Sequence, residues 1–260
     1  MISPSPQTVD NARCRIGAGL TALALLAVVS LWPRPAHSVN AASVPPAPAL
    51  HGPYRTNFLH AENPISEGGH WLNGQKDGLD WADVQTIPGR AFGLEIGGVR
   101  PEPQNYDDAT AVLTGNWGPN QTVEATVFST HPTQTDTMWE EVELRLRSSI
   151  TPHNCTGYEV MFRCSKIPKA YCNIARWEGA LGKFTYLKNL GGSQYGVKTG
   201  DVVKASMIGN VITVYINGAQ IIRVTDDKFS SGNPGMGFFL DHAKGVNRDY
   251  GFSSFMATDQ

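Results

Sequence analysis

The side chains best able to do chemistry gather in one short stretch, from Trp139 to Arg147. Apolar and polar residues alternate along it with a period of two, which is the period of a β-strand. One face would carry Val142, Leu144 and Leu146. The other would carry Trp139, Glu141, Glu143, Arg145 and Arg147. The second face either meets a ligand or forms a surface ladder of ion pairs, which contributes little to stability.

Glu141 and Glu143 have the spacing of a pair of catalytic carboxylates. Two residues apart on one strand, they would lie about 6.5 to 7 Å apart, and the two acids of glycoside hydrolases are roughly 5 to 9.5 Å apart. Arg145 follows on the same face and would lower the pKa of Glu143, which hinders a general acid but suits binding. If the chain is an enzyme, we expect Glu141 and Glu143 to be its catalytic residues.

The arginines favour a second chemistry, elimination from a uronate, which needs a cation to neutralise the sugar carboxylate. Arg145, Arg147 and Arg163 are the candidates, because a guanidinium binds a carboxylate through two hydrogen bonds. The tyrosine or histidine base that elimination also needs cannot be placed from the sequence.

Binding without cleavage is the third possibility. Trp139 and Trp177 would stack on sugar rings, and Glu159 with the arginines would bond to hydroxyl groups. The alternative for each tryptophan is packing in the core. The chain has no G-x-S-x-G, phosphate-loop or H-E-x-x-H motif, so serine hydrolysis, nucleotide binding and zinc proteolysis are disfavoured.

Many short strands must position these residues. Alternation predicts strands at 109–113, 122–128, 139–147, 158–164, 171–177, 184–187, 202–208 and 211–216. Asn217-Gly218 predicts a tight two-residue hairpin turn, and Gly209-Asn210 predicts another turn. No helix is indicated after residue 40. This pattern is typical of a β-sandwich or barrel.

Composition limits the partners. The 260 residues are 41% hydrophobic with a net charge of −2, which suits one β-rich domain with a sizeable core. Nucleic acid is disfavoured as a partner, because phosphate binding needs a basic surplus.

The N-terminus predicts export. Arg13 and Arg15 precede an apolar run from Ile16 to Trp32, which is typical of a signal peptide over residues 1–41. The alternative is an uncleaved membrane anchor. Residues 42–54, rich in proline and alanine, predict a linker, and residues 55–260 form the domain. We expect a secreted or periplasmic protein with no membrane span after cleavage.

Export makes disulfides possible. Cys164 and Cys172 lie on neighbouring predicted strands and are expected to pair across the turn between them, which would leave Cys155 free. The alternative is three thiols.

Three segments resemble a known family. Residues 57–71, with Phe58, a turn of small residues and Trp71, resemble the opening of concanavalin A-like domains of the laminin G type in secreted bacterial proteins. Residues 210–218, a strand ending in Asn217-Gly218, and residues 232–239 resemble later strands of the same family. The resemblance covers residues 55 to 257. It implies an all-β, two-sheet antiparallel jelly-roll sandwich that holds a sugar on its concave sheet.

The resemblance also bears on chemistry. Glucanases of this fold carry an E-x-D-x-E arrangement on one strand, and here Arg145 stands in place of the third acid. Lectin-like members hold calcium in turns, so Asp107, Asp108 and Asp226 are candidate calcium ligands. The alternative is that these aspartates only form the turns. We expect a protein that recognises a polysaccharide or cell-surface glycan. Cleavage in the same groove and a structural or adhesion role are the alternatives.

Overall fold

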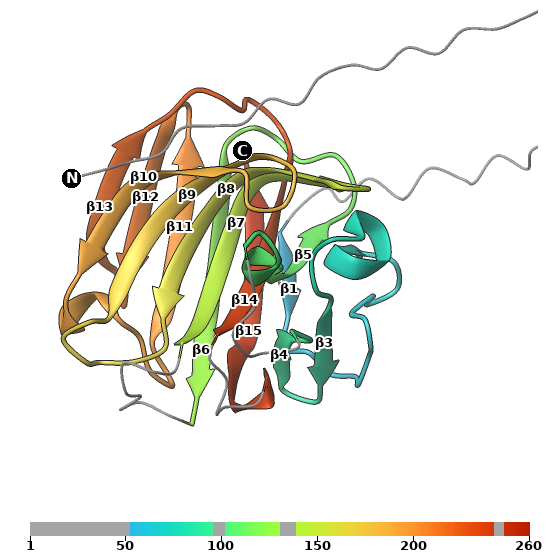
Figure 1. The fold of residues 1–260 in the computed structure, drawn as a ribbon, viewed down its shortest axis with the longest axis horizontal. Helices are drawn as coiled ribbons and strands as arrows, with labels where there is room; N and C mark the ends of the chain where they lie inside the picture. The colour runs from blue at the N-terminus through green and yellow to red at the C-terminus, as the bar shows by residue number, and fades with distance from the viewer. Residues whose placement is uncertain (1–52, 96–101, 131–138, 242–246) are drawn as a thin grey trace, which may run out of the picture. The chain divides into compact units, whose positions relative to one another are not determined.

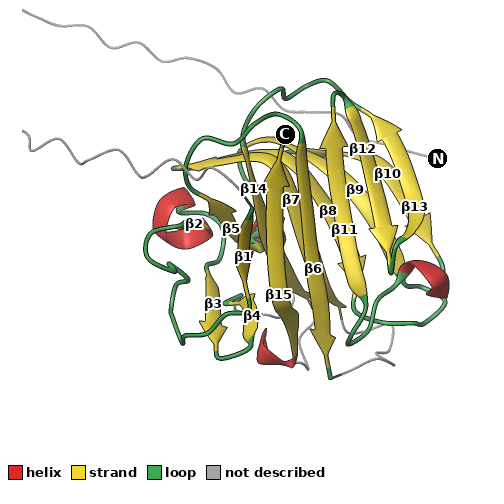
Figure 2. Ribbon diagram, turned by 180° about the vertical axis from the view of Figure 1, so that it is seen from behind, coloured by secondary structure: helices red, strands yellow, loops and turns green. Residues whose placement is uncertain are grey.

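A computed structural model of the chain describes residues 53–95, 102–130, 139–241 and 247–260. Nearly all regular structure in these residues is β, with four helical turns of three to five residues between strands (Figures 1 and 2). None of the helices found there is long and apolar enough to cross a membrane. The predicted signal peptide and most of the predicted linker lie outside the described residues.

The strand that carries the charged row lies near the middle of a sheet of seven strands, in the order β10-β9-β8-β7-β14-β5-β2. All neighbours in this sheet, called the β7 sheet below, run antiparallel. Its strands are β2 (Trp71–Asn73), β5 (Ala109–Leu113), β7 (Trp139–Thr151), β8 (Asn154–Arg163), β9 (Tyr171–Gly179), β10 (Phe184–Gly191) and β14 (Asn233–Asp241).

The second sheet has eight strands, in the order β13-β12-β11-β6-β15-β4-β3, with β1 paired to β15. Its strands are β1 (Tyr54–Thr56), β3 (Val84–Ile87), β4 (Arg90–Gly93), β6 (Gln121–Ser129), β11 (Val202–Ile208), β12 (Val211–Ile216), β13 (Ala219–Thr225) and β15 (Tyr250–Asp259). The fold is therefore the predicted two-sheet antiparallel jelly-roll sandwich.

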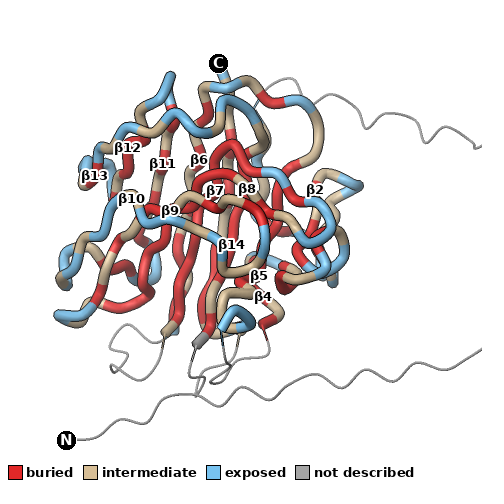
Figure 3. The backbone as a smooth tube through the Cα atoms, turned by 45° about the horizontal axis from the view of Figure 1, so that its top comes forward, coloured by how far each residue is buried: buried red, intermediate tan, exposed pale blue. Residues whose placement is uncertain are grey.

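The core lies between the two sheets and follows the alternation of the sequence. Val142, Leu144 and Leu146 of β7 are fully buried in it, together with Val123 and Val127 of β6 from the opposite sheet. β7 and β8 are buried along most of their length on both faces (Figure 3). The outer face of β7, which points away from the core, is therefore covered and is not a solvated surface.

Most predicted strands are confirmed, and three have the predicted bounds: β5, β11 and β12. The short strands β3 and β4 were not predicted. Asn217 and Gly218 both have positive φ, 50° and 79°, as a two-residue turn between twisted strands requires. The predicted hairpin between β12 and β13 is confirmed.

The predicted disulfide is wrong, because Cys155, Cys164 and Cys172 are free and buried. The register of β8 and β9 places Phe162, not Cys164, opposite Cys172. Cys164 is thus a diagonal neighbour of Cys172, and diagonal neighbours lie about 7–8 Å apart. A disulfide needs Cα atoms about 4.4 to 6.8 Å apart.

Candidate functional site

The register of the β7 sheet pairs the charged row of β7 with opposite charges on β8. Glu141 lies opposite Arg163, and Arg145 lies opposite Glu159. On its other side, Glu143 lies opposite Gly237 of β14. The acids and guanidinium groups predicted to share one face are therefore brought together from adjacent strands.

The outer face of the β7 sheet is hollowed into a cavity of about 270 Å³, called the β7 pocket below. The four carboxylates that line it are almost fully buried, whereas most of the rings are partly exposed, so acids form its floor and rings form its walls. The acids are Asp108, Glu141, Glu143 and Glu159, and the rings are Tyr106, Trp139, Tyr171, Trp177, Phe184, Tyr186 and Phe239; Asn105 and Met161 complete the lining.

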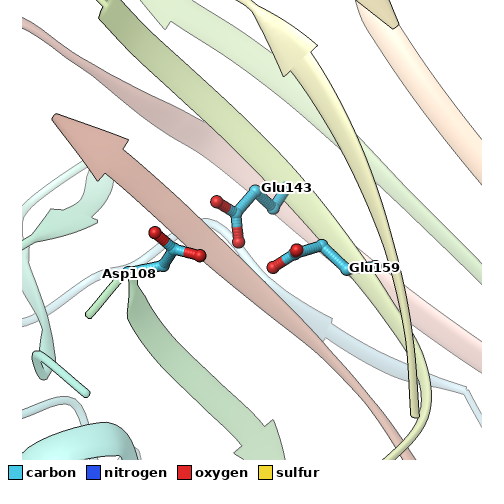
Figure 4. A group of neighbouring side chains, drawn as sticks. All are labelled: Asp108, Glu143 and Glu159. Carbon is cyan, nitrogen blue, oxygen red and sulfur yellow. The ribbon is translucent and has the colours of Figure 1, made fainter. Parts of the chain in front are cut away.

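Three of these acids form one group, called the acid cluster: Asp108, Glu143 and Glu159. One oxygen of each lies within 4.8 Å of an oxygen of the other two (Figure 4). Nη2 of Arg145 lies 3.2 Å from Oε2 of Glu143 and also contacts Oε1 of Glu159. The indole of Trp177 donates to Oε2 of Glu159 at 2.8 Å. The cluster thus combines three carboxylates with one guanidinium.

The acid cluster forms across β14, at a position of that strand that carries no side chain. Asp108 directly precedes β5, and β14 lies between β5 and β7. Gly237 of β14 lies opposite both Thr110 of β5 and Glu143 of β7. A Cβ atom at Gly237 would overlap the carboxylate of Glu143. Glycine in a strand often marks such a close approach, and here it lets Asp108 and Glu143 meet.

Burial controls the charge of the acid cluster. It raises the pKa of Glu143 well above its ordinary value, and the nearby carboxylates of Glu159 and Asp108 raise it further. Burial and Glu159 likewise raise the pKa of Asp108, while Arg145 opposes both shifts. The cause is that a charged carboxylate loses solvation when buried and repels its like-charged neighbours. The cluster therefore holds protons at a pH where exposed acids have lost them.

Glu141 belongs to a second group beside the cluster. It accepts a hydrogen bond from the hydroxyl of Tyr171 at 2.5 Å. Arg163, with 0% of its surface exposed, stacks over the ring of Trp139 with its guanidinium carbon 4.4 Å from the ring centre. It also donates to the carbonyl of Lys169 at 3.2 Å. Arg163 supports the pocket wall from behind and does not line the cavity.

The structure does not bring Arg147 to this group. β7 contains a bulge after Leu146, and Arg147 has a φ of 46°. A bulge redirects the side chain and ends the simple alternation. Arg147 instead donates to the carbonyls of Pro119 at 2.7 Å, Gly209 at 2.6 Å and Phe229 at 2.8 Å. It ties three loops together and does not line the pocket.

The predicted calcium ligands are also separated. Asp226 accepts from the hydroxyl of Tyr158 at 2.7 Å and pairs with Arg176, outside the pocket. Asp107 is not among the pocket residues, whereas Asp108 is. Among the described residues, the acid cluster is the group whose carboxylates converge closely enough for a cation. Carboxylate oxygens are the ligands that hard cations prefer.

Sequence reasoning missed most of the pocket wall. Tyr106, Phe184 and Tyr186 form a row of rings whose centres are 5.1 and 5.2 Å apart. Tyr186 is 49% exposed. Period-two alternation in the strand at 184–187 placed Phe184 and Tyr186 on one face, but nothing in the sequence assigned that face to the pocket.

A larger hollow of about 750 Å³ lies on the second sheet, beside β1 and β15. Two of its three acids, Glu67 and Glu62, are engaged by neighbouring groups. Glu67 accepts from the hydroxyls of Tyr54 and Thr56 and from the indole of Trp71. Glu62 accepts from two backbone amides. These bonds hold the loop before β2 in place, and the β7 pocket is the better candidate site.

No family model matches the sequence, and no curated protein matches it. Solved structures resemble the fold. The potassium-bound carbohydrate recognition domain of Emp46p superposes with a TM-score of 0.53 at 12% identity, over 78% of this chain and 95% of that one. The carbohydrate binding module CBM66 from Bacillus subtilis gives 0.45 at 14%, over 73% and 92%. Porphyranase B from Zobellia galactanivorans gives 0.48 at 9%, over 79% and 90%. The chain has a concanavalin A-like jelly-roll fold.

Proposed function

We propose that this chain binds a glycan in the β7 pocket. The observation that carries the proposal is a single cavity in which partly exposed aromatic rings surround buried carboxylates. Aromatic faces stack on sugar rings, and carboxylates accept hydrogen bonds from sugar hydroxyls. The shared fold with a domain described as carbohydrate-recognising supports the same conclusion.

The size and walls of the pocket suit a short stretch of sugar. About 270 Å³ is just below the usual range of roughly 300 to 1,000 Å³ for small-molecule sites. Tyr186 is the ring best placed to meet it, because it lines the cavity and is 49% exposed, and Trp139 also keeps part of its surface exposed. Tyr186 also continues the row of rings formed by Tyr106 and Phe184, and contiguous apolar surface of this kind is typical of ligand-binding grooves.

Hydrolysis of the bound glycan is a second candidate function. Oxygens of the acid cluster lie within 4.8 Å of one another, an upper limit just below the roughly 5 to 5.5 Å between the carboxyl groups of retaining glycosidases. The raised pKa of Glu143 suits a general acid. Its partner would be Asp108 or Glu159, while the expected Glu141 is bonded to Tyr171. Uronate elimination has less support, because Arg145, Arg147 and Arg163 do not line the cavity.

We also propose that the protein acts after export, as the apolar run from Ile16 to Trp32 indicates. Expression of the full gene, followed by mass measurement of the protein from medium and periplasm, tests this proposal. A mature chain beginning near residue 42 supports it, and an uncleaved chain in the membrane fraction contradicts it.

The glycan proposal is tested by calorimetric titration of the protein with a panel of neutral and charged oligosaccharides. Tyr186→Ala removes a pocket ring and should weaken binding by roughly tenfold, or about 1.4 kcal/mol. Tyr215→Ala is the matched control, since Tyr215 is a partly exposed tyrosine on β12 of the other sheet. Equal effects of the two variants, or no binding to any glycan, would contradict the proposal and favour a structural role.

The same incubations separate binding from cleavage. New reducing ends indicate hydrolysis, and new ultraviolet absorbance from an unsaturated uronate indicates elimination. If hydrolysis occurs, Glu143→Gln should abolish it, because the amide cannot donate a proton as an acid does. Retention of the glycan without products supports binding alone.

A further inference from the structure

Among the described residues, every formal charge that lines the β7 pocket is negative. Asp108, Glu141, Glu143 and Glu159 line it, and none of the arginines and lysines that the structure describes does. The guanidinium of Arg145 is 1% exposed and held by Glu143 and Glu159. An anionic sugar would therefore meet like charges, and a cationic one would meet opposite charges.

The acid cluster also lacks enough positive charge of its own. Three carboxylates share the single guanidinium of Arg145. Asp108 is 7% exposed, and among the described residues no group donates a hydrogen bond to its carboxylate or pairs with it. Its carboxyl group points toward those of Glu143 and Glu159 (Figure 4). A buried carboxylate without a partner is costly, so the cluster is stabilised by any positive group that reaches it.

We propose that the glycan ligand carries an ammonium group, as a 2-amino-2-deoxy sugar does, and that Asp108, Glu143 and Glu159 hold this group. The inference rests on the glycan-binding function proposed above. An ammonium has three N–H donors, and the cluster offers three carboxylates. Charge-assisted N–H···O bonds of about 2.8 Å around a tetrahedral nitrogen place the three acceptors about 4.6 Å apart. The cluster oxygens lie within 4.8 Å of one another, so all three carboxylates are close enough to share one nitrogen.

The surrounding rings fit the same ligand. Trp139 and Phe239 line the cavity along with the acids, and aromatic faces attract cations as well as sugar rings. The N-acetylated form of the same sugar lacks the charge and has only one N–H. A uronate adds a negative charge. The pocket should therefore select among sugars by the group on the ring, with the aromatic contacts unchanged.

Three oligosaccharides of equal length test this inference: oligomers of glucosamine, of N-acetylglucosamine and of galacturonate. They are titrated calorimetrically into the full-length protein at several pH values between 5 and 8, because the raised pKa values of Asp108 and Glu143 make the charge of the cluster depend on pH. The glucosamine oligomer should bind at least tenfold more tightly than the N-acetylated one, and the galacturonate oligomer most weakly. Calcium alone is titrated in parallel, and each titration is repeated with a chelator.

Asp108→Asn separates the ammonium contact from the rest of the pocket. The substitution should reduce glucosamine binding to the level of the N-acetylated oligomer, because the amide keeps the shape and loses the charge. Asp227→Asn is the matched control, since Asp227 is an exposed aspartate outside the pocket. It should leave the preference unchanged. Circular dichroism confirms that both variants are folded.

The outcomes are distinct. Equal or tighter binding of the N-acetylated or galacturonate oligomer overturns the ammonium inference, and so does a preference that survives Asp108→Asn. Calcium that binds the cluster and competes with the glucosamine oligomer identifies a metal site and also overturns it. Binding of another neutral glycan, with no affinity for glucosamine oligomers, overturns the inference and leaves the glycan-binding function in place. Binding of no glycan at all removes both.

Discussion

Two sets of buried carboxylates flank the start of β5: Glu95 on its own, and the acid cluster. They differ in their hydrogen-bond donors. Glu95 is 4% exposed, and its two oxygens accept from the backbone amide of Ala109 at 2.8 Å and the hydroxyl of Tyr250 at 3.2 Å. Asp108, the residue before Ala109, is 7% exposed and has no such donor among the described residues. Buried polar groups are normally hydrogen-bonded. Glu95 is thus satisfied as a structural acid, while Asp108 of the acid cluster lines a pocket and has no donor to its carboxylate among the described residues.

Burial shifts the pKa in the same direction in both groups. Burial raises the pKa of Glu95 from 4.5 to about 8, and Asp107 adds to the shift. Burial and neighbouring carboxylates raise the pKa of Glu143 and Asp108 as well. A pKa that is higher in the folded state contributes stability that is present below the unfolded pKa and lost as pH rises through the folded one. Only in the acid cluster can a ligand cation replace the proton.

The largest expected effect comes from removing the cation of the acid cluster. Arg145→Met leaves three buried carboxylates without a guanidinium, and breaking a buried pair typically costs about 3–5 kcal/mol. The cost should be greater at pH 8 than at pH 5, because protonation relieves the repulsion. Urea unfolding at both pH values measures it.

Arg147→Met is the control for that experiment. Arg147 donates to three backbone carbonyls and pairs with no acid among the described residues. Its loss should destabilise the fold by a similar amount at pH 5 and pH 8. A pH-independent cost for Arg145→Met would show that Arg145 does not neutralise the cluster.

The second effect concerns the space above β14. Gly237→Ala introduces a methyl group that overlaps the carboxylate of Glu143, and such overpacking typically costs about 1–3 kcal/mol. Gly191→Ala, on β10 of the same sheet, meets nothing within 4 Å and should be close to neutral. Unfolding free energies of both variants test this.

A double mutant tests whether the cost of Gly237→Ala comes from its overlap with Glu143. In a Glu143→Ala background, Gly237→Ala should cost much less, because the overlapping group is gone. An unchanged cost would place the strain at the backbone of β14 and not at the acid cluster.

The third effect directly compares the two acid groups. Glu95→Gln and Asp108→Asn each remove a carboxylate whose pKa is raised, so each should stabilise the protein at pH 9 by about 1 kcal/mol or more and have little effect near pH 4. Only Asp108→Asn should lower glycan affinity. Thermal unfolding across this pH range and calorimetric titration provide the two measurements. Lower affinity in Glu95→Gln would mean that the two groups are coupled.

The sequence predicted the sandwich because its core obeys a simple rule. Val142, Leu144 and Leu146 alternate with charged residues, and a strand must bury such a face. The tight turn at Asn217-Gly218 was predictable because its residues tolerate positive φ. β3 and β4 were missed because four-residue strands carry too little alternation to stand out.

The candidate site was only partly predictable, because it depends on register between strands far apart in sequence. Glu143 and Arg145 were expected on one face, and they lie there. Arg147 does not lie on that face, because β7 contains a bulge that no local sequence pattern indicates. Asp108 and Glu143 meet across β14 at Gly237. The order of the strands in the sheet brings them together, and their separation in the sequence does not indicate it.

The smallest expected effect tests the charge count of the acid cluster. Sγ of Cys155 lies 3.8 Å from Nη1 of Arg145, and burial raises the pKa of this thiol to about 11. The sulfur is therefore neutral at pH 8, and Arg145 is neutralised by carboxylates alone. Cys155→Ser should change stability by less than about 1 kcal/mol, because the hydroxyl can still accept from Arg145. Cys172→Ser, in the apolar core, should cost more.

A large, pH-dependent cost for Cys155→Ser, measured by urea unfolding between pH 6 and pH 9, would reveal a thiolate beside Arg145. The cluster would then carry one more negative charge than its three carboxylates supply, and its need for a cation would be greater than the contrast with Glu95 implies.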